Sequence, residues 1–224
     1  MSTIIYGHTI MNLLFNHGTG NGSALDVIES AFQTGDYVPL FGLTNRNGER
    51  KELQTYLDHG PLVLSFYRGS LRPYFNRRLK TYINHLAEII NTGVTVIVVS
   101  PEKAIRLDKL IKDSVKKSPS NRSANDIKFE VLYDENNCLA EQFGLQFTLP
   151  KSHKKSLEKF SVNVKKINGT NIFTFTNHAT YVIDTNGKIS WALVPNNDRK
   201  LATVDEIVAA VNKHQDSFES MEYQ

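Results

Sequence analysis

The run from Val94 to Val99, which reads VTVIVV, limits the fold more than any other part of the chain. A strand with one solvated face alternates apolar and polar residues, whereas a strand that is covered on both faces is apolar or β-branched throughout. The run does not alternate, so we expect it to be a central strand of a parallel sheet. Ser100 and Pro101 then stand at the N-cap and first position of a helix, which predicts that a helix follows directly.

Strands and helices are expected to alternate along the rest of the chain. Further strands are expected over residues 38–43, 49–52, 62–67, 129–133, 180–183 and 188–193. Helices are expected over residues 8–16, 24–32, 53–57, 74–90, 101–115, 135–143, 151–160 and 204–211, and an insertion over residues 161–176. Asn45-Arg46-Asn47-Gly48 and Asp184-Thr185-Asn186-Gly187 have the composition of hairpin turns. This order predicts an α/β fold: a central mixed sheet with helices on both faces, an N-terminal hairpin and a helical extension.

The chain is expected to form one domain with a short segment at each end. Residues 1–34 are expected to be a helical extension and linker, residues 35–218 the domain, and residues 219–224 a tail. A protein of 224 residues is long enough to bury a sizeable core.

Composition argues against several classes of function. The formal net charge of +3 is too small to indicate nucleic-acid binding. The single cysteine, Cys138, cannot form an intramolecular disulfide, so nothing favours an oxidising compartment. The apolar patch over residues 10–15 is too short and too polar for a signal peptide or a membrane span, and we expect a cytoplasmic protein. Cofactor-binding motifs are missing and the seven histidines lack the spacing of metal ligands, so neither a cofactor nor a metal is expected.

Residues 61–80 combine a strand, a tight turn and a helix. They read PLVLSFYRGSLRPYFNRRLK, with an apolar strand before Arg68-Gly69-Ser70 and Pro73 in the first turn of the helix. This is the arrangement of a thiol redox site, in which unpaired N–H groups at the helix start stabilise a thiolate. The turn contains no cysteine.

Four sequence blocks, in order, resemble one family. The blocks are Gly35-Asp36-Tyr37-Val38-Pro39-Leu40-Phe41, Gly60-Pro61-Leu62-Val63-Leu64-Ser65-Phe66-Tyr67-Arg68-Gly69, Asp134-Glu135-Asn136-Asn137 with Ala140 and Phe143-Gly144-Leu145, and Ala179-Thr180-Tyr181-Val182-Ile183-Asp184 with Asn186-Gly187-Lys188-Ile189. Together they resemble the peroxiredoxin-like branch of the alkyl hydroperoxide reductase/thiol-specific antioxidant family over residues 35–212. The resemblance implies a thioredoxin-like fold.

The resemblance also implies that the active-site turn is degenerate. The family turn reads G-x-W-C-P-Y-C-N after F-Y-R-G. On that pattern Leu71 stands at the tryptophan, Arg72 at the first cysteine and Phe75 at the second, while Pro73, Tyr74 and Asn76 match. Arginine cannot attack a peroxide, and phenylalanine cannot resolve a mixed disulfide.

The resemblance points to a second departure at His178. The family has a proline before A-T-Y-V-I-D, typically cis and facing the redox cysteines. A cis bond before a residue other than proline costs about 3–4 kcal/mol, so we expect a trans bond and a reshaped loop. His178 is therefore grouped with the degenerate turn.

These departures favour a function without catalysis. The leading hypothesis is a degenerate peroxiredoxin-like protein that serves as a binding or interaction module. Leu71, Tyr74 and Phe75 could form an exposed patch that binds a partner protein. A homodimer is expected from the family and from the apolar N-terminal arm.

Two alternatives remain open. In the first, Cys138 is the nucleophile of a thiol peroxidase, with Arg68 as a stabilising cation; the simpler interpretation is a buried or half-buried cysteine on a helix face. In the second, Arg68, Arg72 and the helix start form an anion-binding sensor. The simpler interpretation of Arg72 is a solvated side chain.

Overall fold

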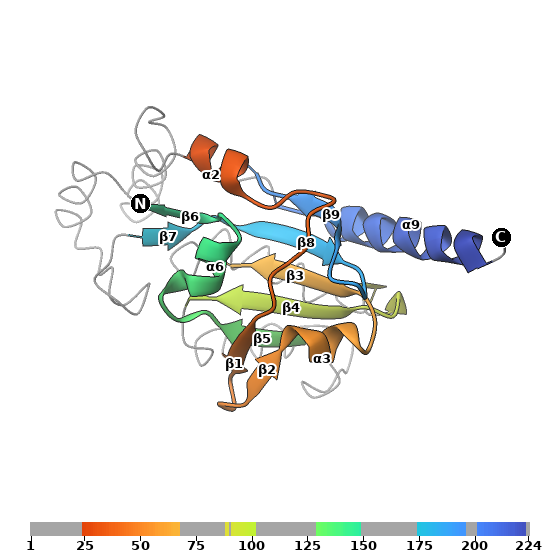
Figure 1. Cartoon of the computed structure of the whole chain (residues 1–224), viewed down its shortest axis with the longest axis horizontal. Helices are drawn as coiled ribbons and strands as arrows, with labels where there is room; N and C mark the ends of the chain where they lie inside the picture. Colours follow the sequence, from red (N-terminus) through yellow and green to blue (C-terminus); the bar gives the residue numbers. More distant parts are fainter. Residues whose placement is uncertain are drawn as a thin grey trace, which may run out of the picture.

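A seven-stranded mixed sheet forms the centre of the molecule (Figure 1). The structure, a computed structural model, describes residues 24–67, 88–89, 91–101, 129–148, 174–195 and 201–222. The strands are β1 (Gly42–Asn45), β2 (Arg50–Glu52), β3 (Leu62–Phe66), β4 (Thr95–Ser100), β5 (Phe129–Tyr133), β6 (Gln146–Thr148), β7 (Thr174–Thr176), β8 (Ala179–Ile183) and β9 (Ile189–Leu193). The helices are α2 (Ala24–Ser30), α3 (Leu53–Leu57), η1 (Glu135–Asn137), α6 (Cys138–Gln142) and α9 (Val204–Glu222).

The order of strands in the sheet is β2-β1-β5-β4-β3-β8-β9. Strands β3, β4 and β5 run parallel, while β8 runs antiparallel to β3 and β9 antiparallel to β8. The β-branched run lies in β4, between two parallel neighbours, and its residues from Val96 to Ser100 are buried. The predicted thioredoxin-like mixed sheet is confirmed.

Alternate residues of each strand point to opposite faces of the sheet. Both faces carry apolar side chains here, and helices cover each of them. On one face Leu64, Phe66 and Tyr181 pack in a core cluster that includes residues of α2, α3 and α6. On the other face Val63, Val96 and Val182 pack in a second cluster with Ile207 and Val211 of α9. Helix α9 continues past the strands toward the C-terminus (Figure 1).

Helix α2 is packed into the first core cluster. Val27 and Ala31 are buried there, and the rings of Phe32 and Phe143 lie 5.1 Å apart. The Ser30 hydroxyl donates to the carbonyl of Gly144 over 3.0 Å. The segment 24–32, predicted as a helix of the N-terminal extension, thus contributes directly to the core.

Several boundaries differ from the prediction. Strand β1 begins at Gly42 rather than residue 38, β7 lies inside the expected insertion over 161–176, and α9 runs to Glu222 rather than residue 211. Glu88 and Ile89 are helical, as expected. The other residues of that helix and the helices predicted over 8–16, 101–115 and 151–160 lie outside the described residues, apart from Pro101.

The helix predicted over 135–143 is broken. Asn136 and Asn137 have φ values of 59° and 58°, in the left-handed region that a helix cannot contain. The backbone therefore makes one turn of η1 and restarts as α6. Gly144 ends α6 with a φ of +66°, which confirms the predicted glycine C-cap.

The two hairpin turns are built on one plan. The Oδ1 atom of Asn45 accepts hydrogen bonds from the backbone nitrogens of Asn47 (2.9 Å) and Glu49 (3.0 Å). The Oδ1 atom of Asp184 likewise accepts from Asn186 (2.8 Å) and Lys188 (2.9 Å). Each turn has a glycine at positive φ, +81° at Gly48 and +79° at Gly187, as Asn-Gly turns require.

The Tyr181 hydroxyl yields a first prediction. The Tyr181 side chain is fully buried, and its hydroxyl makes no hydrogen bond within the described part of the protein. Burial raises the pKa of this phenol. We expect Tyr181→Phe to leave the free energy of unfolding unchanged or to raise it by up to about 1 kcal/mol, because an unsatisfied polar group is removed.

Tyr56→Phe is the matched control. The Tyr56 hydroxyl donates to the Glu130 carboxylate, so the same substitution there should cost about 1.5–3 kcal/mol. Urea unfolding of both variants checks the pair. A loss at Tyr181 as large as the loss at Tyr56 would contradict the prediction.

Candidate functional site

The sequence places the candidate site after strand β3. Tyr67 is the last described residue before that turn. The turn residues of the predicted site lie outside the described residues: Arg68, Leu71, Arg72, Pro73, Tyr74, Phe75 and Asn76. The anion-binding and partner-binding hypotheses that rest on them stay predictions.

Polar side chains, half-buried at Ser65 and buried at Thr180 and His178, lie near the described end of this site. Ser65 of β3 pairs in register with Thr180 of β8, and their hydroxyl oxygens lie 3.1 Å apart. Strand alternation puts them on the face of the sheet shared with Val63 and Val182. His178, two residues before Thr180, is 3% exposed. At the ends of β3 and β8 the polar side chains are thus buried at Thr180 and His178 and half-buried at Ser65.

The loop before β8 is held by hydrogen bonds on both sides. The backbone nitrogen of Asn177 donates to Leu145 over 2.7 Å, and its side-chain amide donates to the Pro195 carbonyl over 3.1 Å. The Thr176 hydroxyl donates to the Asn137 side chain over 2.6 Å. The peptide bond before His178 is trans, as predicted, in the position where the family pattern has a proline.

Cys138 lies at the start of α6 and is exposed, which corrects the prediction that it is buried or half-buried. The helix start does not favour its thiolate, because a carboxylate already occupies that position. The Asp134 carboxylate accepts hydrogen bonds from the backbone nitrogens of Leu139 and Ala140, each over 2.9 Å. Its negative charge offsets the helix dipole that was expected to lower the pKa of the thiol.

The pKa of the Cys138 thiol is raised rather than lowered. The main cause is partial desolvation at the protein surface, followed by the negative charges of Asp134, Glu141 and Glu135. A raised pKa leaves less thiolate at neutral pH, and the thiolate is the species that attacks a peroxide. The surroundings of Cys138 are therefore opposite to those of an activated cysteine.

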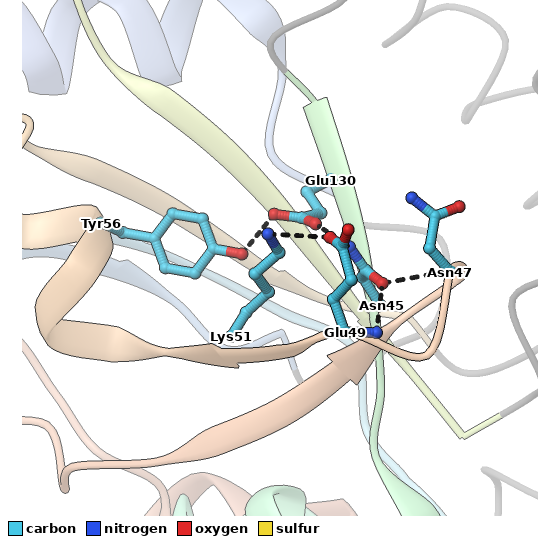
Figure 2. A network of polar contacts seen from close by, with 6 residues as sticks. All are labelled: Asn45, Asn47, Glu49, Lys51, Tyr56 and Glu130. Atoms are coloured by element: carbon cyan, nitrogen blue, oxygen red, sulfur yellow. Dashed lines mark hydrogen bonds and ion pairs between the residues drawn. The ribbon is translucent and has the colours of Figure 1, made fainter.

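A second polar cluster joins the β1–β2 hairpin to α3 and β5 (Figure 2). The side-chain amide of Asn45 donates to Glu130 over 2.7 Å and to Glu49 over 2.9 Å. The Lys51 ammonium lies 3.0 Å from the Glu49 carboxylate, and the Tyr56 hydroxyl donates to Glu130. Two carboxylates thus share one amide, with a cation at one side and a phenol at the other.

This network has a structural character. The Lys51 ammonium stabilises the charged form of Glu49, because its hydrogen bond lowers the pKa of that carboxyl group. The network links the β1–β2 hairpin and α3, which follow one another in the sequence, to the distant strand β5, and Glu130 accepts from both Asn45 and Tyr56. Within the described part of the protein, no group of three or more His, Cys, Asp or Glu side chains has the arrangement to hold a metal ion.

Sequence reasoning missed most of these residues. Glu130 stands in an otherwise apolar strand, and that interruption was the available signal. No local pattern indicated the contacts of Asn137 and Asn177. Asn137 accepts from Thr176 and Asn177 donates to Pro195, and the fold brings each pair together. The charges around Cys138, by contrast, could have been predicted from the spacing of Asp134, Glu135 and Glu141 alone.

Comparison with known protein families identifies the family of this protein. A profile of the AhpC/TSA family matches residues 34–192, well over half of the sequence. The protein belongs to the AhpC/TSA family. A search of curated protein sequences found no match.

Solved structures with the same fold are peroxiredoxins of distant sequence. Peroxidoxin BcpB of Mycobacterium tuberculosis has a TM-score of 0.57 and 18% identity, and the match covers 81% of this protein and 97% of that one. A mutant of the peroxiredoxin 6 of Arenicola marina has a TM-score of 0.63 and 16% identity, with coverage of 82% and 74%. Reduced Prx3 of Vibrio vulnificus in complex with hydrogen peroxide has a TM-score of 0.59 and 16% identity, with coverage of 82% and 98%. At these identities the likeness supports the shared fold alone.

The thiol content of this protein differs from the family pattern used above. Cys138 is its single cysteine, and it lies at the start of α6 rather than after β3. The family pattern puts its two cysteines at positions that Arg72 and Phe75 occupy here. None of the described helices is both long enough and apolar enough to cross a membrane.

Proposed function

We propose that this AhpC/TSA family member acts as a binding module and not as a peroxidase. The observation that carries the proposal is the environment of Cys138, the only thiol of the sequence. Its pKa is raised, its helix start is neutralised by Asp134, and it is absent from the family's cysteine positions. The seven-stranded sheet and its buried core support a scaffold that has kept its fold.

The alternative, a peroxidase that uses Cys138, is tested by peroxide consumption. We expect the wild-type protein and Cys138→Ser, each with a thiol donor and hydrogen peroxide, to consume peroxide at the same background rate. Consumption by wild type that Cys138→Ser abolishes would overturn the proposal. Residual consumption by both proteins at a rate above buffer would point to a contaminant, and repurification would remove it.

The reactivity of the thiol gives an independent readout. The rate of Cys138 alkylation by iodoacetamide should rise with pH along a curve shifted above that of a free cysteine, whose pKa is about 8.5. Asp134→Asn would disturb the cap of α6, so Glu141→Gln is the better probe of the charge effect, and it should shift the curve to lower pH. A wild-type curve shifted below that of free cysteine would contradict the raised pKa.

Binding itself is tested at the predicted partner site. We expect proteins that co-purify with the wild-type protein to be lost from a variant with Leu71→Ser and Phe75→Ser. Arg78→Ser, on the same predicted helix but outside the apolar patch, is the control. Equal recovery by all three proteins would place partner binding elsewhere.

We also infer that the protein associates with a second copy through the outer edge of β9 beyond Ile189, whose own backbone nitrogen and oxygen are bonded to Asp36 and Gly35. The two edges of the sheet differ: β2 has the charged sequence Arg-Lys-Glu, whereas β9 has the uncharged sequence Ile-Ser-Trp-Ala-Leu. Short, charged edge strands resist pairing, whereas longer uncharged ones favour it. An antiparallel edge can pair with its own copy about a two-fold axis.

Light scattering after gel filtration tests this partner. The expected result is a dimer that persists when residues 1–23 are removed, because β9 and the buried α2 remain. A truncation at Gly35 would not be a fair test, since it removes Val27 and Ala31 from the core. A monomer at all concentrations would exclude the association, and dissociation on removal of residues 1–23 would assign it to the N-terminal arm instead.

A further inference from the structure

Two Asn-Gly pairs stand in hairpin turns of the same plan, and they differ in how firmly they are held. Asn47 and Gly48 are both exposed, and the side chain of Asn47 points away from the polar network (Figure 2). Asn186 is exposed, but Gly187 is buried. We propose that Asn47 is a site of spontaneous deamidation and that Asn186 is protected from the same reaction.

The reaction needs no partner other than water. The backbone nitrogen of Gly48 attacks the carbonyl carbon of the Asn47 side chain, and a new C–N bond closes a five-membered imide. The C–N bond of the side-chain amide breaks, and its nitrogen leaves as ammonia with the proton from the Gly48 amide. Water then opens the imide at either carbonyl, giving aspartate or isoaspartate. Glycine at the second position leaves the attacking nitrogen unshielded, because it has no Cβ atom.

Attack requires the turn to open locally. In both turns the glycine nitrogen is engaged, from Gly48 to the Asn45 carbonyl and from Gly187 to the Asp184 carbonyl, each over 3.0 Å. The nitrogen must leave this bond before it can reach the side chain. The rate of conversion therefore follows how often each turn opens, which is greatest for exposed segments with few packing contacts.

Beyond its own hydrogen bonds, the first turn is tied to β5 by the Asn45 side-chain amide, which donates to Glu130 over 2.7 Å. It lies at the outer edge of the sheet, where β2 has three residues. A Cβ atom built on Gly48 would meet no atom of the described residues within 4 Å. Every residue from Arg46 to Arg50 is exposed.

The second turn is covered by the segment that follows α2. The backbone nitrogen of Val38 donates to the Gly187 carbonyl over 2.9 Å, and that of Ile189 donates to Asp36 over 2.8 Å. Tyr37 forms a β-bridge with Lys188. Opening this turn would break these bonds as well, and one extra backbone hydrogen bond slows opening by roughly tenfold.

Conversion at Asn47 has a structural consequence. Isoaspartate carries the backbone through a carbon atom of the former side chain, which lengthens the turn by one atom. The Oδ1 atom of Asn45 can then no longer accept from both Asn47 and Glu49. The network of Asn45, Glu130 and Tyr56 loses its anchor in the hairpin, so the aged protein should be less stable than the fresh protein.

Peptide mapping of the full-length protein after incubation at mildly alkaline pH tests the proposal. In the expected product, the peptide containing Asn47 carries –OH in place of –NH2 and includes an isoaspartate isomer. This conversion should be about tenfold or more faster than that of the peptide containing Asn186. In urea, where both turns are unfolded, the two rates should become similar. Equal rates in the folded protein, or faster conversion at Asn186, would overturn the proposal.

A pair of variants separates turn opening from intrinsic reactivity. Asn45→Ala removes the two hydrogen bonds that brace the first turn and should accelerate conversion at Asn47 alone. Asp184→Ala does the same for the second turn and should accelerate conversion at Asn186 alone. Acceleration at neither site would show that these hydrogen bonds do not control the reaction, and the structural account would fail.

Discussion

Replacing Asn45 with aspartate is expected to lower the free energy of unfolding by about 3 kcal/mol. The Asn45 amide donates to two carboxylates, those of Glu130 and Glu49, and it is 8% exposed. Aspartate keeps the acceptor that braces the turn but has no donor, so a third negative charge would face the other two. The lost hydrogen bond to a charged acceptor accounts for about 1.5–3 kcal/mol, and repulsion adds to it.

Asp184→Asn is the matched control. Asp184 holds the same position in the second hairpin turn and is 6% exposed. Its Oδ1 atom accepts the same two backbone bonds, which an asparagine oxygen can accept equally. We expect a loss below about 1 kcal/mol. Urea denaturation of both variants measures the contrast, and equal losses would show that the carboxylate pair does not matter.

The pH dependence of Asn45→Asp supplies a sharper test. Nearby carboxylates raise the pKa of the new carboxyl group in the folded state above its unfolded value. A group of this kind destabilises the folded protein at neutral pH, and the penalty shrinks as the pH falls through the raised pKa. The deficit relative to wild type should therefore diminish in acid. A deficit independent of pH would assign the loss to packing.

The second large effect is expected at Gly144. A Cβ atom there would overlap the carbonyl oxygen of Ser30 and lie 2.6 Å from its carbonyl carbon and 3.0 Å from the nitrogen of Ala31. These are backbone atoms of the segment that packs against α6, so they cannot move aside as the end of a flexible side group would. Gly144→Ala should cost about 4 kcal/mol or more, a size reserved for core overpacking and backbone strain.

Gly93→Ala separates strain from overlap. Gly93 has a φ of +86°, and no atom of the described residues lies within 4 Å of an added Cβ, so we expect alanine there to cost only the left-handed conformation, about 1–2 kcal/mol. Thermal unfolding ranks the two variants. Hydrogen exchange should in addition rise at the Ala31 amide, which is bonded to Val27, in Gly144→Ala alone. Equal stability of the two variants would refute the close packing of α2 on α6.

Much of the fold could be predicted because local chemistry determined it. The β-branched run predicted β4, and the Asn-Gly pairs predicted both hairpins. The break at Asn136 and Asn137 was missed, although asparagine adopts the left-handed conformation more readily than most residues. The bond from Thr176 to Asn137 forms only in the folded protein and leaves no local pattern. Strands β6 and β7 were missed because three residues each carry too little pattern to predict a strand.

Only the local features of the candidate site could be predicted from the sequence. The family blocks predicted the degenerate turn, which lies outside the described residues, and the charges near Cys138 follow from its neighbours in the sequence. The polar network did not, since Glu130 reaches Asn45 across 85 positions and Tyr56 across 74. Contacts of that range depend on strand order, and no local pattern indicates them.

The pairing of β3 with β8 has a consequence for how the protein is made. Ser65 and Thr180, which face one another in the sheet, are 115 positions apart. During synthesis β3, β4 and β5 can assemble as soon as Tyr133 has emerged, but the other edge of β3 stays open until β8 follows. Non-local pairing of this kind slows folding. An apolar strand edge that stays unpaired in the meantime promotes association with other polypeptides. The nascent protein therefore passes through an interval in which its central strand is its most vulnerable part.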